Sequence, residues 1–216
     1  MHRIVALFAC ALVFAACSET VESVDQNIGE RHPDLSIPLA KSNRWVYAEQ
    51  SLAPVFSDSP EHTGFIARID TFISRDDLQS YALYRTNQSG AWSDVGLVYR
   101  PLESRITAAT LSTIGGTTVL TFQPDRFDVA AHPFVGDTMP AFGTARLVCR
   151  TVDTTVVMQG RTFKNVAIYQ RLGATNASPE ENDQMWVRPG IGIIYSREYV
   201  GPGQTRESSL QSCKLH

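Results

Sequence analysis

Apolar and polar residues alternate along several short segments of this chain, and the alternation is the strongest constraint on its fold. It is clearest at residues 63–73. Phe65, Ala67 and Ile69 fall on one side of this segment, and Arg68 falls on the other. Successive side chains of a β-strand point to opposite faces, so a period of two predicts a strand with one buried face.

The same pattern extends along the chain from Asn43 onward. Strands are predicted at residues 44–50, 63–73, 81–85, 93–100, 117–122, 144–152, 156–158, 162–171, 184–188, 191–199 and 205–215. Glycine-containing pairs between several of them predict tight turns. About ten short strands joined by turns predict an all-β domain, namely a mainly antiparallel sheet that is curled or partly closed into a barrel.

Three segments leave alternatives within this prediction. Residues 124–140 contain three prolines and are interpreted as a loop. Residues 75–84 are the best candidate for a helix. A division into two β lobes near residues 124–136 is the alternative to a single sheet.

The N-terminus carries an apolar run at residues 4–16, after Arg3. A spanning helix needs about 20 apolar residues, so this shorter run matches the apolar centre of a secretory signal. Phe14-Ala15-Ala16-Cys17 resembles the lipobox of bacterial lipoproteins. The resemblance implies that residues 1–16 are removed and that Cys17 becomes the first residue, acylated with chains such as palmitate. The alternatives are an ordinary cleaved signal with a free Cys17, or a simple anchor.

The segment after the signal, residues 17–38, is polar and acidic, with two prolines and no periodicity. We expect it to be a lipidated flexible tether that leads to an all-β domain at residues 39–216. Under the sorting rule known for enteric bacteria, Ser18 beside the lipidated cysteine favours the outer membrane. The expected location is therefore the bacterial cell envelope, on the outer membrane and facing the periplasm.

Cysteine parity agrees with a lipid on Cys17. Cys10 leaves with the signal, so Cys149 and Cys213 remain as an even pair in an oxidising compartment. A disulfide between them is expected. It would close a loop of about 65 residues and contribute about 4 kcal/mol in the chain-entropy model. The alternative is two separate buried thiols.

The sequence carries no signature of catalysis or of metal binding. Gly-x-Ser-x-Gly, His-x-His and Cys-x-x-Cys are absent from it. Its 19 basic and 22 acidic residues leave no basic excess for nucleic acid. We therefore expect no enzyme activity, no cofactor, no metal site and no nucleic-acid partner. The histidines of the mature chain are scattered, and they are His32, His62, His132 and His216.

Four arginines are candidates for the lining of a groove that binds anionic polymers or lipid headgroups. Arg146 and Arg150 fall on one face of a predicted strand, and Arg188 and Arg197 flank a predicted hairpin. The alternative, which we favour, is a solvated face on which arginines pair with nearby acids.

Four motifs follow one another through the mature chain. Residues 38–47 contain Pro-Leu and then Asn-Arg-Trp-Val-Tyr, residues 135–137 are Val-Gly-Asp, residues 160–166 are Gly-x-x-Phe-x-Asn-Val, and residues 189–195 are Pro-Gly-x-Gly-x-x-Tyr. Together they resemble the motifs of a widespread, poorly characterised family of bacterial envelope lipoproteins. The resemblance implies an all-β envelope protein and no established activity, so it assigns no catalytic residue.

The function expected from these features is a non-catalytic binding or interaction role at the membrane. One form of it is a sheet whose apolar concave face holds a lipid or acyl chain, which requires a cavity of several hundred Å³. A second is a structural module that docks on an envelope partner, which requires an exposed apolar patch. An envelope hydrolase is the third alternative and requires converging Ser, His and acidic side chains.

Overall fold

The computed structural model describes residues 34–52, 61–73, 81–88, 91–140, 146–172, 183–201 and 204–216. Every secondary-structure element in these ranges is a β-strand, and none of them contains a helix long and apolar enough to span a membrane. The strands are β1 (Arg44–Leu52), β2 (Glu61–Ile73), β3 (Tyr81–Gln88), β4 (Ala91–Arg100), β5 (Arg105–Ile114), β6 (Thr117–Phe122), β7 (Asp128–Ala130), β8 (Thr138–Pro140), β9 (Arg146–Met158), β10 (Arg161–Arg171), β11 (Gln184–Arg188), β12 (Gly192–Gly201) and β13 (Gln204–Lys214).

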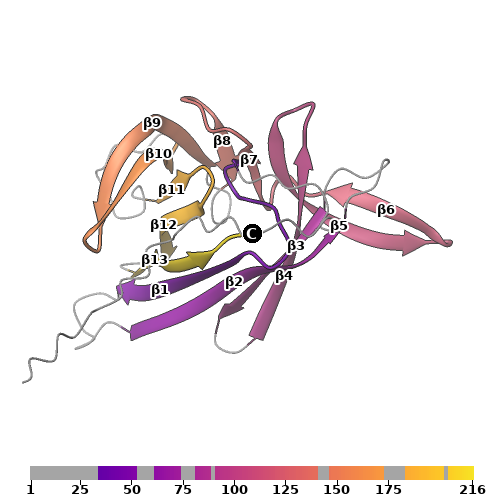
Figure 1. Cartoon of the computed structure of the whole chain (residues 1–216), viewed down its shortest axis with the longest axis horizontal. Coiled ribbons are helices and arrows are strands. Elements are labelled where there is room, and N and C mark those ends of the chain that lie inside the picture. Colours follow the sequence, from indigo (N-terminus) through magenta and orange to yellow (C-terminus); the bar gives the residue numbers. More distant parts are fainter. Residues whose placement is uncertain are drawn as a thin grey trace, which may run out of the picture.

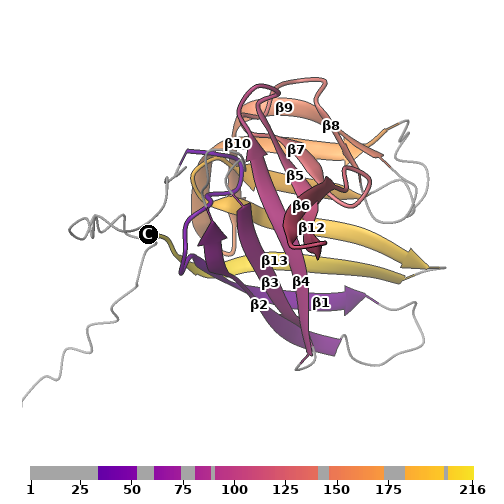
Figure 2. The same cartoon turned by 90° about the vertical axis from the view of Figure 1, so that its right-hand side faces the viewer.

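All these strands belong to one antiparallel sheet that curls around a core (Figures 1 and 2). Its order is β6-β5-β4-β3-β2-β1-β13-β12-β11-β10-β9-β8, and β7 pairs with β5. The predicted all-β class with a curled antiparallel sheet is confirmed, and the sheet is not closed. Because β1 pairs with both β2 and β13, the two halves of the chain share one sheet and not two lobes.

The concave face of the sheet is filled by the protein's own side chains. In β1, Trp45, Tyr47 and Glu49 are buried, whereas Arg44, which directly precedes Trp45, is exposed. A strand with one buried face requires this period of two. The largest fully buried side chains of this core are Trp45, Tyr169, Leu35, Leu39, Ile69, Ile106, Met139, Leu147, Ile194, Leu210 and Val129.

Residues 34–43 cross one end of the curled sheet before β1 begins. Leu35 is 2% exposed and packs in the main core. The Ser36 N–H donates a hydrogen bond to the Ala131 carbonyl at 2.7 Å. The predicted boundary, with a flexible tether up to residue 38, is therefore corrected. The apolar residues at the end of that segment are spaced to fill the core, and they belong to the domain.

The β5–β6 hairpin projects from the sheet as a two-stranded ribbon (Figure 1). β4 pairs with β5 only as far as Ala109, whereas β6 pairs with β5 out to Ile114. Both residues of its Gly115-Gly116 turn have positive φ, at 59° and 82°, as a type I′ hairpin turn requires. In the described part of the chain, no strand pairs with the outer edge of β6.

Three strands were missed by the sequence prediction. β5 was not predicted, because its residues are buried in a run and then exposed, without alternation. β7 and β8 lie within residues 124–140, which were predicted to be a loop. Each of these two strands has only three residues, too few to show a period.

Two further predictions are corrected by the strand bounds. The last four residues of the helix candidate 75–84 begin β3, and its earlier residues lie outside the described part of the chain. The strands predicted at 144–152 and 156–158 are one strand, β9. Asp153 has a φ of 56° in its middle, where the register with β10 also shifts, and this irregularity interrupts the sequence pattern.

Candidate interaction surface

The first and last sequence motifs hold each other on the concave side. The Trp45 indole N–H donates to the Ile191 carbonyl at 2.6 Å, and the Tyr47 hydroxyl donates to the Ile193 carbonyl at 2.8 Å. β13 lies between β1 and β12 in the sheet, so these bonds cross the concave face. Both aromatic residues therefore serve packing and pairing of the fold.

The Pro-Gly-x-Gly segment forms the turn that the sequence predicted. Gly190 and Gly192 have φ values of 79° and 107°, a region that favours glycine. Trp186 of β11 pairs with Tyr195 of β12, and their ring centroids lie 4.6 Å apart. The predicted packing across this hairpin is confirmed.

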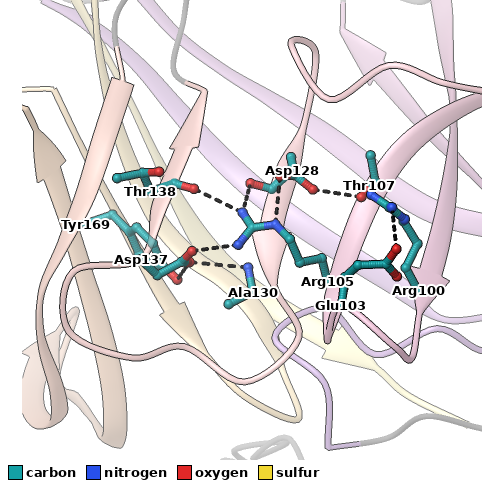
Figure 3. Close-up of polar contacts among 9 residues, drawn as sticks. All are labelled: Arg100, Glu103, Arg105, Thr107, Asp128, Ala130, Asp137, Thr138 and Tyr169. Carbon is teal, nitrogen blue, oxygen red and sulfur yellow. Dashed lines mark hydrogen bonds and ion pairs between the residues drawn. The ribbon is translucent and has the colours of Figure 1, made fainter.

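Arg105 bridges the place where the sheet stops short of closing (Figure 3). β7 pairs with β5 and β8 pairs with β9, but these two strands, both fully described, form no ladder with each other. The Arg105 guanidinium donates to the Asp128 carboxylate at 2.7 Å and to the Thr138 carbonyl at 3.0 Å. It also donates to Asp137 at 2.8 Å. Arg105 thus joins the two strands through side-chain contacts in place of a ladder.

The place where β7 and β8 meet without a ladder is here called the seam. Asp137 is its buried acceptor, and the Asp137 side chain is 1% exposed. Besides Arg105, its carboxylate accepts from the Ala130 N–H at 3.2 Å and from the Tyr169 hydroxyl at 2.8 Å. A buried carboxylate is stable only when donors of this kind surround it. The Val-Gly-Asp motif is therefore explained by Gly136, whose φ is 92° in the turn, and by the acceptor that follows it.

A second group of charged side chains lies on the concave face, toward the other end of β1. Arg206 lies 3.7 Å from both Glu49 and Glu198. Asp183 accepts from the Tyr199 N–H at 2.6 Å. These groups come from β1, β12, β13 and the residue before β11, so only the folded sheet brings them together.

Burial raises the pKa of Glu198 and the pKa of Asp183 above their ordinary values. Arg206 opposes the rise at Glu198, whereas Asp183 and Glu49 add to it. Acids with shifted pKa values are candidates for functional sites. Within the residues that the structure describes, however, no three His, Cys, Asp or Glu side chains are grouped to hold a metal ion. The ion pairs of Arg206 with Glu49 and Glu198 explain these charged side chains as part of the fold and not as a functional site.

Cys149 and Cys213 are thiols in the structure, and the predicted disulfide between them is not present. Cys149 lies in β9 and Cys213 in β13, with β10, β11 and β12 between them in the sheet. A disulfide needs its two Cα atoms within about 7 Å of each other. Adjacent strands already lie about 4.8 Å apart, so two strands of a sheet that are separated by three others lie too far apart for this bond. The structure favours the alternative of two separate thiols. Burial raises the pKa of the Cys149 thiol to about 11.

Several predicted residues lie outside the described ranges. They include Cys17 and the tether up to residue 33, so lipidation stays a prediction. His32 and the side chain of His62 are also outside, whereas His132 and His216 are exposed near a turn and at the C-terminus. Among the arginines, Arg197 lies 3.6 Å from Glu207, in line with the paired-surface interpretation.

Beyond Arg105, the β5–β6 ribbon carries exposed apolar side chains and no charged residue, and at its base the Arg100 guanidinium lies 4.7 Å from the Phe122 ring centroid. The 19 residues between Arg105 and Asp125 contain no Asp, Glu, Lys, Arg or His. Ile114, Val119 and Phe122 are exposed large apolar residues of this ribbon. Natural sheets usually protect an edge with charge, proline or a bulge. The Thr-Thr-Val-Leu-Thr-Phe sequence of β6 contains no charged residue and no proline.

A small apolar cluster on the other face of the sheet supports the base of the ribbon. Tyr81 and Ala109 are buried there, and Leu111 and Leu120 of the ribbon pack against them. The Tyr81 ring covers Gly96 so closely that a Cβ at Gly96 would lie 2.4 Å from it. The ribbon is therefore anchored on one face, and its outer edge stays accessible. This surface was not predicted from the sequence, in which its one signal is the uncharged run at residues 106–124.

Comparisons with known proteins add little to this geometry. No protein-family model and no curated protein matches the chain. Among solved structures, the crystal structure of a "putative lipoprotein" from Parabacteroides distasonis is similar, with a TM-score of 0.41 and 11% sequence identity. The alignment covers 84% of this chain and 99% of that chain. A similarity this remote transfers no activity, ligand or location.

Proposed function

We propose that the chain is a lipoprotein of the bacterial envelope that binds a partner protein through the β5–β6 ribbon and performs no catalytic step. The acyl chains on Cys17 anchor it to the outer membrane, where it faces the periplasm. The observation that carries the docking role is the outer edge of β6, which is unpaired and uncharged and displays exposed apolar side chains.

An open strand edge binds another strand through main-chain hydrogen bonds. Each unpaired N–H and C=O group along β6 is a donor or acceptor for an extended segment of the partner. Side chains such as Val119 and Phe122 add apolar contacts. The partner segment is uncharged where it faces β6, because β6 has no charged side chain of its own to pair with a charge on that segment.

The alternative of an acyl chain held in the concave face has weaker support. That face is occupied by large buried side chains, including Trp45, Met139 and Tyr169. A ligand entering it has to displace packed side chains, which costs several kcal/mol for residues of this size. The hydrolase alternative has no observation in its favour.

The docking test places a photo-crosslinking residue at Thr121 of β6 in the full chain, expressed in bacterial cells. Thr162 of β10, another exposed strand threonine, is the matched control position. We expect a discrete adduct from position 121 and none from position 162. Val119→Lys should abolish the adduct, because a charge on the edge opposes strand addition.

Two results contradict this proposal. One is an equal adduct at both positions, and the other is an adduct at position 121 that Val119→Lys leaves unchanged. An adduct with the mass of two copies of the chain identifies self-association as the form of docking.

The anchor has a separate test. Cys17→Ala should release the protein from the membrane fraction and abolish incorporation of labelled palmitate. An unchanged membrane fraction refutes the anchor and leaves the docking test unaffected.

A further inference from the structure

Two turns of the domain expose large apolar side chains. Leu102, in the turn between β4 and β5, is 94% exposed. Phe134 and Val135, in the turn between β7 and β8, are 57% and 61% exposed. Single exposed apolar residues are ordinary, but a group of them at one place marks an interaction site.

A backbone hydrogen bond brings these two turns to the same end of the domain. The Ala131 N–H donates to the Ser104 carbonyl at 2.8 Å. Leu102 lies two residues before Ser104, and Phe134 lies three residues after Ala131. Arg100 and Glu103, beside Leu102, form an ion pair with each other at 2.6 Å, and the exposed His132 is the ionisable side chain nearest to Phe134 in the chain.

The N-terminal part of the chain joins the domain at this same end. The Ala131 carbonyl, next to the exposed turn, accepts from the N–H of Ser36 at 2.7 Å. If Cys17 is the anchor, the 16 residues between it and residue 34 are the only link to the bilayer. At about 3.4 Å per residue they reach at most about 55 Å. The chain therefore enters the domain beside the two apolar turns, and a tether of this length lets that end reach the membrane surface.

We propose that this end docks on the lipid bilayer, with Leu102, Phe134 and Val135 inserted at the level of the headgroups and upper acyl chains. The inference rests on the proposed anchor, which supplies a high local concentration of lipid. The contact is weak without the anchor, because three partly inserted side chains remove only a small apolar area from water. It is insensitive to salt and needs no anionic lipid, because apolar burial drives it.

The test measures insertion directly, with tryptophan reporters in the mature chain. Phe134→Trp is compared with Val157→Trp, a residue that is 70% exposed and lies next to the last residue of β9, where it pairs with Thr162 of β10. Each variant carries an N-terminal histidine tag and is attached to phosphatidylcholine vesicles that contain a nickel-chelating lipid. This attachment replaces the lipid on Cys17, so the result does not depend on lipidation.

We expect brominated acyl chains to quench the added fluorescence of Phe134→Trp, with a blue shift, and to leave that of Val157→Trp unchanged. The parent chain, with its native tryptophans, gives the background. Quenching should persist at high salt. Equal quenching at both positions, or none at position 134, overturns the proposal. If Cys17 is found unlipidated in cells while position 134 is quenched, the anchor fails and the docking surface stands.

Discussion

The guanidinium of Arg105 lies 2.8 Å from the carboxylate of Asp137, across the one place where β7 and β8 lie side by side without a ladder. The same guanidinium reaches Asp128 at 2.7 Å. Curling brings the two strands together, and this side chain joins them. The stability of the domain should therefore depend on this contact more than on other ion pairs of the sheet.

Asp137→Ala is expected to lower the free energy of unfolding by about 3 kcal/mol, because it leaves the buried Tyr169 hydroxyl without its acceptor and removes one of the two carboxylates that pair with Arg105. Urea denaturation measures the change. Glu103→Ala breaks the more exposed Arg100–Glu103 pair and should cost less than about 1 kcal/mol. Similar losses in both variants would show that the seam is no stronger than a surface pair.

Leu35→Ala is expected to cost about 2–5 kcal/mol, as for other large core residues. The residue precedes β1 and lies in the segment that the sequence assigned to a tether, yet it is buried in the core. Leu102→Ala is the matched control, since Leu102 is exposed, and it should change stability by less than about 0.5 kcal/mol. If Leu35→Ala left the free energy of unfolding unchanged, residues 34–38 would belong to the tether and not to the domain.

Asp183→Asn should change how stability depends on pH. Burial raises the pKa of Asp183 in the folded state above its ordinary 3.8, although Arg171 and Arg197 oppose the shift. A raised folded pKa contributes stability that is fully present below the unfolded pKa and is lost as pH rises through the folded pKa. The asparagine variant should therefore have a higher free energy of unfolding than the parent at pH 7. This difference should disappear as the pH falls toward the ordinary pKa of the carboxyl group.

Urea denaturation of both proteins across this pH range checks the prediction. Asp34→Asn, at an exposed position, is the control and should follow the parent at each pH. A stability difference between Asp183→Asn and the parent that stays constant with pH would contradict the assignment of the effect to Asp183.

Cys149 and Cys213 should both be found as thiols in the mature protein under non-reducing conditions. Cys149 should react slowly with alkylating reagents in the folded state, because burial raises its pKa to about 11 and keeps the thiol protonated at neutral pH. Unfolding in urea should expose both to rapid labelling. A disulfide in non-reducing peptide mass analysis would contradict the strand arrangement between β9 and β13.

Local pattern was sufficient for much of the sheet. β6 and β11 have the bounds that their neighbouring turn residues and, for β6, the Thr and Val content predicted. The alternation of apolar and polar residues in a half-buried strand lies within the strand itself, so it can be recognised without the rest of the chain. The same is true of the Gly190 turn, whose positive φ follows from the residue type.

Other features depended on contacts between distant residues, and no local pattern could reveal them. The three-residue strands β7 and β8 exist because β5 and β9 offer them edges to pair with. The roles of Trp45 and Asp137 are set by partners 146 and 32 residues away. Parity suggested that Cys149 and Cys213 would pair, but the strand order placed three strands between them.

The sequence by itself determined that this chain forms an antiparallel β-sheet with one buried face, because alternation is a local property of each strand. Only the tertiary structure decided that the concave face is filled and that Arg105 joins β7 and β8, which form no ladder with each other. It also decided that the ribbon and the two apolar turns stay exposed. Those outcomes follow from which strands become neighbours, and that depends on the packing of the whole chain.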